Sequence, residues 1–219
     1  MGQFAMGQSV PRTEDPRLLT GRGRYIDDVS MIGQCHAHLL RSPHAHARIR
    51  AIDVATAERM AGVVGVFTGA DWAADDLGHH VPEWKYQRRD GSPMYVPPRP
   101  ALALDRVMLV GDPVALILAE TIEQARDAAE AITVDYEPLP VLTATDAATG
   151  PDAPTLWQDC ADNETFFFTQ GDKQAVDAAF DRAHHVTSLR IVINRVTAAT
   201  MEPRACVGSY DAADDRYTI

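Results

Sequence analysis

The most regular pattern of apolar and polar positions lies between residues 106 and 140. Two short apolar runs, at 107–110 and 114–119, are separated by a Gly-Asp-Pro sequence at 111–113. Such runs are typical of well-buried strands, and the three residues between them favour a tight turn. This part of the chain therefore predicts two buried strands joined by a turn.

A helix is predicted immediately after the second run. Thr121 followed three residues later by Gln124 fits a capping box, and apolar residues recur at helical spacing over 122–132. Residues 133–137 then alternate in polarity before two prolines, which predicts a half-buried strand. The order is strand, turn, strand, helix and strand.

Weaker patterns precede this unit. Two strand-like runs, 34–42 and 47–53, flank a segment that predicts a hairpin or a short connection. A short helix over 54–61 is expected to end at Gly62 in the left-handed conformation, and a buried strand is expected at 63–67.

Residues 75–100 have neither a helical nor a strand period and contain five prolines. Loops of this length are uncommon unless they are functional or disordered, and the aromatic content favours an ordered loop. The candidates within it are an aromatic pair and a basic pair: Trp84, Tyr86, Arg88 and Arg89. A loop that only covers surface remains the alternative.

The C-terminal third changes character at 143–165, where small, proline and polar residues predict a linker. A helix with one apolar stripe is expected over 172–183, and a strand over 187–193. Residues 205–219 predict a hairpin with a three-residue return strand, so this last unit is expected to be incomplete.

Composition narrows the function classes. The 31 acidic and 20 basic residues give a net charge of −11, which opposes binding to nucleic acid or to an anionic membrane surface. No run reaches the roughly 18 apolar residues that a membrane-spanning helix needs. Three widely spaced cysteines, Cys35, Cys160 and Cys206, suit a reducing compartment and small buried positions. The sequence predicts a cytoplasmic protein without membrane insertion.

Motifs for stand-alone chemistry, such as G-x-S-x-G, H-E-x-x-H or a phosphate loop, do not occur in the sequence. The histidines at 36, 38, 44 and 46 could share a metal, although polar histidines of strands and turns are the favoured interpretation. Glu202 and Arg204 could form a bidentate pair within a core or poise a general base, and a structural ion pair is favoured.

Several spaced motifs carry a family resemblance. They are Arg12–Asp15, Leu18–Asp28, Arg41–Ile49, Gly62–Asp71, Val110–Ala115 with Gly111, Asp112 and Pro113, Val134–Pro140, and Met201–Arg204 with Glu202 and Arg204. Together and in this order they resemble the start of the molybdopterin-binding large subunit of the xanthine dehydrogenase, aldehyde oxidase and aerobic carbon monoxide dehydrogenase family.

The resemblance implies an α+β fold class, with an α/β hammerhead domain followed by the beginning of a mixed α/β molybdenum-binding domain. The implied domains are an extended N-terminal arm at 1–33, the hammerhead at 34–145, a linker at 146–165, and an incomplete molybdopterin-binding domain at 166–219.

The implied activity is an oxidoreductase that hydroxylates aldehydes or N-heteroaromatics, or oxidises carbon monoxide, with water as the oxygen source. The complete subunit would hold molybdopterin of the cytosine dinucleotide type. Electrons would leave through 2Fe-2S iron–sulfur clusters on a small subunit to FAD on a medium subunit. These subunits and the remainder of the molybdenum-binding subunit are the implied partners.

Catalytic residues, cofactor-binding residues and metal ligands are expected beyond residue 219, so none is assigned. Trp84, Tyr86, Arg88 and Arg89 are candidates for a substrate funnel or an interface, and the motif residues at 111–113, 202 and 204 are expected to be structural. The alternative function is a stand-alone, non-catalytic docking protein built on a hammerhead domain.

Overall fold

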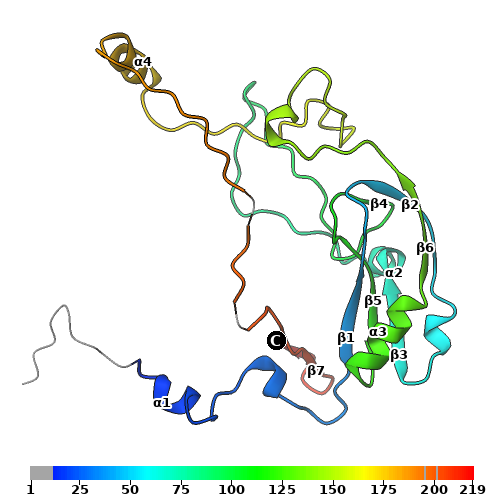
Figure 1. Ribbon diagram of the computed structural model, residues 1–219. Helices are drawn as coiled ribbons and strands as arrows, with labels where there is room; N and C mark the ends of the chain where they lie inside the picture. The colour runs from blue at the N-terminus through cyan, green and yellow to red at the C-terminus, as the bar shows by residue number, and fades with distance from the viewer. Residues whose placement is uncertain (1–11, 195, 201) are drawn as a thin grey trace, which may run out of the picture. The chain divides into compact units, whose positions relative to one another are not determined.

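A computed structural model describes residues 12–194, 196–200 and 202–219. The chain forms two compact units (Figure 1). The larger unit spans residues 35–186, and the smaller one combines the residues before 35 with those from 187 onward. Each unit is described by itself.

The first sheet of the larger unit has β5 (Pro113–Ala119) at its centre, with β1 (His36–Arg41) and β3 (Val63–Thr68) antiparallel to it on either side. The second sheet has β2 (Ala47–Asp53) at its centre, between β4 (Arg106–Val107) and β6 (Thr133–Pro138). These sheets and their helices form the expected α+β fold.

β1 and β2 do not pair as a hairpin, which was one of the two connections predicted. They belong to different sheets, because β1 takes β5 as its partner and β2 takes β6. The residue after β1 instead fixes the neighbouring turn: the Ser42 amide donates to the Asp112 carbonyl at 2.9 Å, and the Gly111 amide donates to the Ser42 carbonyl at 2.8 Å.

The strand predicted at 107–110 is shorter than expected, because β4 ends at Val107. The Asp112 carboxylate accepts the amides of Met108 at 2.6 Å and Leu109 at 3.1 Å, so these donors serve a turn and not a strand ladder. The two predicted strands exist on either side of this turn but lie in separate sheets.

Helix α3 (Ile122–Glu130) confirms the predicted capping box. The Thr121 hydroxyl accepts the Gln124 amide at 3.2 Å, and the Gln124 side-chain carbonyl accepts the Thr121 amide at 3.0 Å. Figure 1 shows α3 against the first sheet, and its buried face consists of small residues, which allow close packing on Ala115, Ile117 and Ala119 of β5.

The shorter helical elements differ in detail from the prediction. The helix expected at 54–61 is a 3-10 helix, η2 (Ala57–Arg59), and Gly62 follows with φ +81°, as predicted. Helix α2 (Gly69–Ala74) was not predicted. The Asp71 carboxylate accepts the Thr68 amide at 2.7 Å and its hydroxyl at 2.9 Å, so Thr-x-x-Asp was an overlooked helix start signal.

Residues 75–100 form a loop, and the segment after β6 contains one short 3-10 helix, η3 (Thr145–Ala147). Helix α4 (Lys173–Asp181) lies within the predicted range, and its first turn is capped where the Asp172 carboxylate accepts the Ala175 amide at 3.0 Å. No residue of α4 is buried within the described part of the chain.

The smaller unit contains α1 (Asp15–Leu18), η1 (Ile26–Asp28) and a hairpin of β7 (Ser209–Asp211) with β8 (Arg216–Thr218). The predicted hairpin is confirmed, although its first strand begins later than residue 205. The strand predicted at 187–193 is not formed, and these residues belong to none of the described sheets. The described helices include none that is long and apolar enough to cross a membrane.

Candidate functional site

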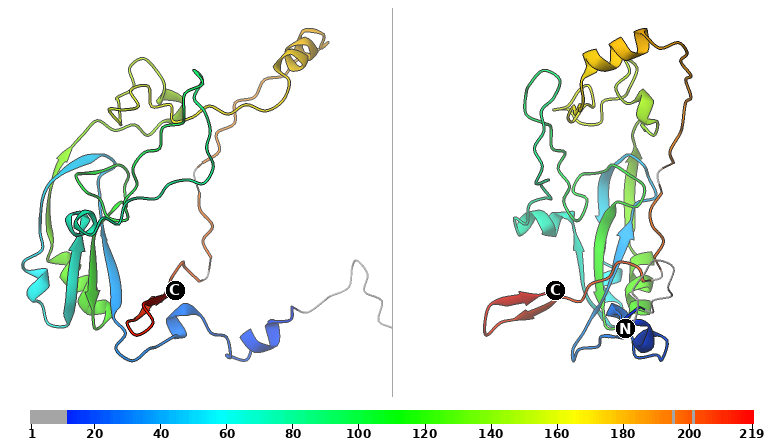
Figure 2. Two further views of the ribbon diagram at one scale, coloured as in Figure 1. Left: turned by 180° about the vertical axis from the view of Figure 1, so that it is seen from behind. Right: turned by 90° about the vertical axis from the view of Figure 1, so that its left-hand side faces the viewer.

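The candidate site is a contact between two segments of the larger unit, the hairpin 86–94 and the extended segment 160–168, which we call the clasp. Gln87 bridges to Pro93 within the hairpin and also to Phe167 of the extended segment. The Phe167 amide donates to the Gln87 carbonyl at 2.9 Å. Both views of Figure 2 show the loop of the hairpin beside this later segment.

The first side-chain contact of the clasp is an ion pair between Arg88 and Asp162. The Arg88 Nη2 atom donates to both carboxylate oxygens of Asp162, at 2.5 Å for Oδ1. The Glu164 amide also donates to Oδ1, at 3.1 Å. This amide hydrogen bond, followed by the Arg88 charge, lowers the pKa of Asp162 against the opposing effect of burial.

The second contact is an ion pair between Arg89 and Glu164, with 2.7 Å between Nε and Oε2. The Arg89 guanidinium also lies 3.8 Å from the centre of the Phe167 ring, in cation–π contact. Adjacent arginines of the hairpin therefore bind alternate acidic residues of the extended segment.

Aromatic rings cover one part of the clasp. The Tyr86 ring lies 4.9 Å from the Phe166 ring in a stacked arrangement and 5.6 Å from the Phe168 ring edge to face. Such pairs contribute about 0.5–1.5 kcal/mol beyond the area that they bury. Trp84, just before the hairpin, is 75% exposed and projects an indole surface to solvent.

The hairpin turn is stabilised locally. The Asp90 carboxylate accepts the Ser92 hydroxyl at 2.7 Å and the Ser92 amide at 2.9 Å, and these two hydrogen bonds lower the pKa of Asp90. Gly91 has φ +82°, which side chains rarely adopt. The turn therefore presents the two preceding arginines on a defined backbone.

Asn163 holds the extended segment in shape. Its Nδ2 donates to the carbonyls of Ala148 and Pro154, at 3.0 Å each, and its Oδ1 accepts the Leu156 amide at 3.0 Å. Its φ of +57° is a conformation that asparagine tolerates. Cys160 is buried beside it, and burial raises the pKa of its thiol. The predicted linker region therefore contains a folded turn.

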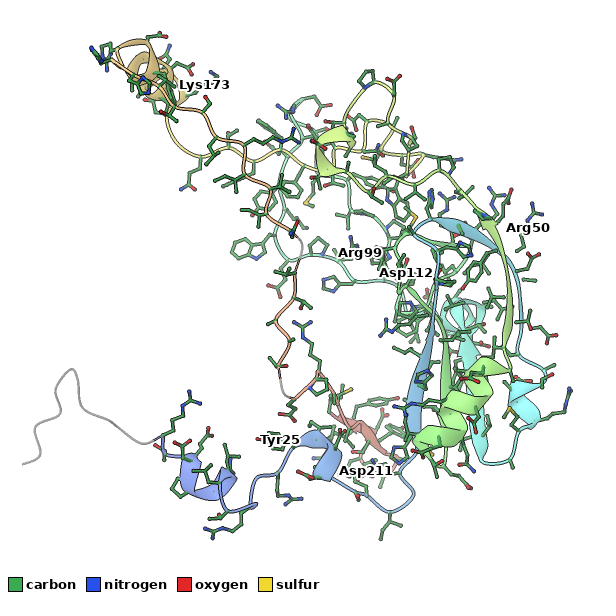
Figure 3. The ribbon with its side chains drawn as sticks, viewed as in Figure 1. Tyr25, Arg50, Arg99, Asp112, Lys173 and Asp211 are labelled. Carbon is green, nitrogen blue, oxygen red and sulfur yellow. The ribbon has the colours of Figure 1, made fainter. Side chains whose placement is uncertain are left out.

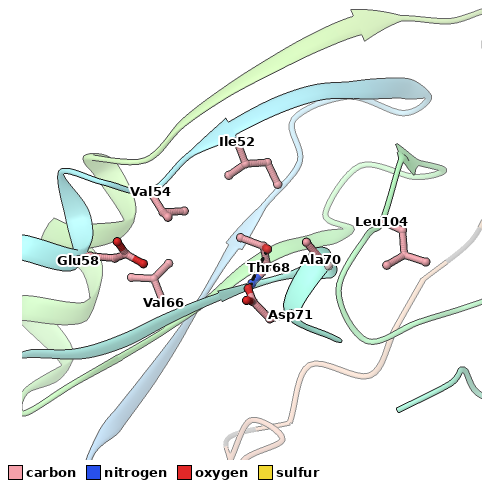
Figure 4. Close-up of a pocket in the computed structure, with 9 residues that line it drawn as sticks. Ile52, Val54, Glu58, Val66, Thr68, Ala70, Asp71 and Leu104 are labelled. Carbon is pink, nitrogen blue, oxygen red and sulfur yellow. Dashed lines mark hydrogen bonds between the residues drawn. The ribbon is translucent and has the colours of Figure 1, made fainter. Parts of the chain in front are cut away.

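Two cavities open near the sheets. One of about 340 Å³, shown in Figure 4, is lined by Ile52, Val54, Glu58, Val66, Thr68, Gly69, Ala70, Asp71 and Leu104. The other, of about 310 Å³, lies between residues 97–113 and 156–157, with a mainly apolar lining. Arg99 and Asp112, both labelled in Figure 3, contribute polar groups to it.

Of the four loop candidates, the structure places Tyr86, Arg88 and Arg89 in contact with the extended segment. Trp84 makes no ring contact with the other described aromatic residues. Sequence reasoning missed their partners, Asp162, Glu164 and Phe166, because the surrounding small and polar residues indicated a linker. The overlooked signal was the alternation of two acids directly before three phenylalanines.

The other motif residues have separate positions. Asp112 and its neighbours form the turn before β5, as described above. Glu202 and Arg204 form no ion pair with each other, and both side chains are exposed, so the ion pair expected within a core is wrong. Glu202 instead accepts the Ile26 amide at 3.2 Å, at the start of η1.

The histidines do not converge. His46 is buried, and its Nδ1 lies 2.7 Å from the Pro140 carbonyl, to which it donates. The His44 ring packs 4.8 Å from the Tyr136 ring. Within the described residues, no group of three or more His, Cys, Asp or Glu side chains is arranged to hold a metal ion.

These features define a protein with an α/β hammerhead arrangement, whose loop hairpin holds a later extended segment of the same chain. The family model for the aldehyde oxidase and xanthine dehydrogenase α/β hammerhead domain matches residues 20–140. A molybdopterin cofactor-binding domain model matches residues 157–219. The chain belongs to the aldehyde oxidase and xanthine dehydrogenase family.

Curated relatives are similar over nearly the whole chain. The nicotine 6-hydroxylase large subunit of Paenarthrobacter nicotinovorans is 40% identical over 217 residues, covering 98% of this chain and 25% of that protein. The carbon monoxide dehydrogenase large chain of Afipia carboxidovorans is 35% identical over 226 residues, covering 98% and 27%. The chain spans about a quarter of the length of these relatives.

Solved structures are similar in fold. A Cu,Mo carbon monoxide dehydrogenase matches with a TM-score of 0.65 and 36% identity, over 82% of this chain and 23% of that chain. Quinoline 2-oxidoreductase from Pseudomonas putida 86 matches with a TM-score of 0.58 and 43% identity, over 67% and 18%.

The linings of the two cavities do not match a molybdopterin group. The cavity shown in Figure 4 carries the carboxylates of Glu58 and Asp71, which repel an anionic phosphate. The second cavity is mainly apolar, with cationic and anionic side chains mixed along its wall. Neither of these two cavities therefore has a lining that fits this cofactor.

Proposed function

We propose that this chain is the N-terminal portion of the molybdenum-binding large subunit of a multi-subunit oxidoreductase. The observation that carries the proposal is the tandem order of the two family matches, the hammerhead at 20–140 and the cofactor-binding domain at 157–219. The relatives that are similar over 98% of the chain are large subunits of a nicotine hydroxylase and a carbon monoxide dehydrogenase.

The complete enzyme hydroxylates an aldehyde or an N-heteroaromatic compound, or oxidises carbon monoxide, and takes the oxygen atom from water. When bound, a molybdopterin group of the cytosine dinucleotide type supplies the two-electron chemistry. Iron–sulfur clusters and FAD, on small and medium partner subunits, carry the electrons away. The assembly is cytoplasmic.

Within this assembly, the chain supplies a scaffold and one wall of the substrate funnel. The two cavities support the scaffold role over a cofactor-holding role, because neither has a ligand set for the pterin. The stand-alone docking alternative has less support, since the relatives described above are all named as enzyme subunits or chains.

The decisive experiment is metal and pterin analysis of the native complex captured through this chain. We expect molybdenum and a pterin nucleotide in the complex, together with iron and flavin from the partner subunits. The isolated 219-residue chain serves as the control, and we expect none of these groups on it. A native complex that contains no molybdenum would refute the proposal.

The loop candidates have a proposed role as a lip of the funnel or as a contact with a partner subunit. Trp84 supports this role because its indole is mostly exposed on a long loop, and binding residues are frequently placed on loops. Trp84→Ala is expected to lower kcat/KM or weaken assembly of the complete enzyme while leaving the thermal midpoint of the chain unchanged.

A matched control is Val64→Ala, which removes exposed apolar surface from β3, away from the loop. It is expected to leave both kcat/KM and assembly intact. If Trp84→Ala behaves like Val64→Ala in the complete enzyme, the loop has no such role. If Trp84→Ala unfolds the chain, the indole contributes to packing instead.

A further inference from the structure

The clasp joins the two regions that the family models match separately. Its hairpin, residues 86–94, lies in the hammerhead match, whereas its extended segment, residues 160–168, lies in the cofactor-binding domain match. Among the described residues, the Gln87–Phe167 bridge links the two segments, and the Tyr95 amide just after the hairpin donates to the Thr165 carbonyl at 2.9 Å. So few backbone links leave the register of an extended segment weakly specified, and side chains therefore contribute to its selection.

The side chains of the extended segment follow a strand-like alternation that matches the hairpin. Asp162 and Glu164 are two residues apart, and each meets a different arginine. Phe166 continues this alternation and stacks on Tyr86, whereas Phe167 lies under the Arg89 guanidinium. A shift by one residue would exchange acids for Asn163 and Thr165 and leave both arginines without their carboxylates.

We propose that the hairpin is a recognition site for an extended peptide of the pattern acid-x-acid followed by aromatic residues, and that Arg88 and Arg89 determine its register. The occupant is residues 160–168 of this chain. The proposal deepens the proposed function, because the recognised segment would be the entry to the cofactor-binding domain, held in place by the hammerhead.

The two ion pairs differ in which partner is buried, and this difference supports a role of the arginines in setting the register of the extended segment. Arg88 is the more enclosed arginine, and its Nε atom is buried without a hydrogen-bond partner among the described residues. Its Nη2 atom donates to Asp162, so loss of that carboxylate leaves an enclosed cation without its ion-pair partner. In the second pair the carboxylate of Glu164 is the enclosed group, and Arg89 is exposed.

The test is site-resolved amide hydrogen exchange on the full chain, measured at Phe167 and at Tyr95. Both amides donate hydrogen bonds that link the two segments. The Phe167 amide donates to the Gln87 carbonyl, and the Tyr95 amide, just after the hairpin, donates to the Thr165 carbonyl, at 2.9 Å each. Arg88→Glu and Asp162→Arg, each alone, are expected to speed exchange about five- to tenfold by removing an ion pair and creating repulsion. The Ala125 amide in α3 reports on the global fold and is expected not to change.

The double variant Arg88→Glu with Asp162→Arg is expected to restore slow exchange to within about twofold, because it rebuilds the same pair with reversed charges. The mismatched double variant Arg88→Glu with Glu164→Arg is the matched control. It carries the same change in net charge, yet its exchange is expected to stay fast, because the side chain of residue 88 pairs with residue 162 and not with residue 164.

If the mismatched variant is restored as well as the matched one, the arginines act through general electrostatics and the proposal is wrong. Unchanged exchange in the single variants also overturns it. Asp162→Asn keeps the acceptor for the Glu164 amide and removes the charge, so it tests the ion pair if a charge reversal prevents folding. None of these measurements requires molybdenum, so their outcome is independent of the metal analysis that tests the proposed function.

Discussion

Gly62 connects a backbone conformation to the cap of α3, and its replacement has a calculable cost. Gly62 has φ +81°, and a Cβ atom built on it would clash with Nε2 of the Gln124 side chain and lie 2.5 Å from its Oε1. The same Oε1 accepts the Thr121 amide in the capping box. In Gly62→Ala, Gln124 must therefore move and give up this hydrogen bond.

Two terms contribute to the expected loss of stability. A left-handed conformation costs a residue with a Cβ about 1–2 kcal/mol. Loss of a capping interaction costs about 1 kcal/mol. Gly62→Ala should therefore lower the free energy of unfolding by about 2–3 kcal/mol, and Gln124→Ala by about 1 kcal/mol. In the Gln124→Ala background, Gly62→Ala should cost only about 1–2 kcal/mol, because nothing remains to be displaced.

The assay is urea denaturation of the full chain, followed by circular dichroism, on the four proteins of this cycle. Gly111→Ala is the matched control, because Gly111 has φ +94° but a Cβ there would meet no atom within 4 Å. It should cost about 1–2 kcal/mol in either background. If Gly62→Ala and Gln124→Ala are additive within about 0.5 kcal/mol, the contact does not couple the glycine to the cap and the reasoning is refuted.

Three further predictions concern other parts of the chain. Asn163→Asp replaces two donated hydrogen bonds with repulsion between oxygens, so the Leu156 amide should exchange faster and a protease should cut earlier within 146–165. Asp159→Asn, at an exposed position, is the control. Equal cutting of both variants would contradict this prediction. The pKa of Asp71 is lowered, first by the Thr68 amide and second by the Thr68 hydroxyl, so the stability that its carboxylate contributes is present above the unfolded-state pKa and is lost as the pH falls through the folded-state pKa. The stability difference between the parent and Asp71→Asn should therefore shrink as the pH is lowered from about 6 to about 3. A constant difference in urea titrations would contradict this prediction. Leu189, Ile191 and Ile193 are 71–88% exposed, and fully burying such a side chain contributes about 1.5–3 kcal/mol. Amides 187–194 should therefore exchange fast in the isolated chain and slowly once the remainder of the subunit is supplied. Slow exchange in the isolated chain would show that this segment is already packed.

Local signals in the sequence were sufficient for the elements whose partners are close along the chain. The capping box of Thr121 and Gln124, the left-handed Gly62 and the final hairpin each depend on contacts within a few residues. The spaced motifs between residues 12 and 204 likewise identified the family, because the order of motifs along the chain can be recognised without knowing the tertiary contacts.

Tertiary structure decided which strands pair and what the polar segments do. β1 and β2 are adjacent in sequence yet belong to separate sheets: β1 pairs with β5, on which α3 packs, and β2 pairs with β4 and β6. Residues 146–168 were predicted as a linker followed by a new domain, a division that stays a prediction, and their contacts with the loop were not foreseen. The ion pair of Arg88 with Asp162 spans 74 residues, and no local period encodes such a distance. The sequence determined the residues of the clasp, and only the fold determined that they meet.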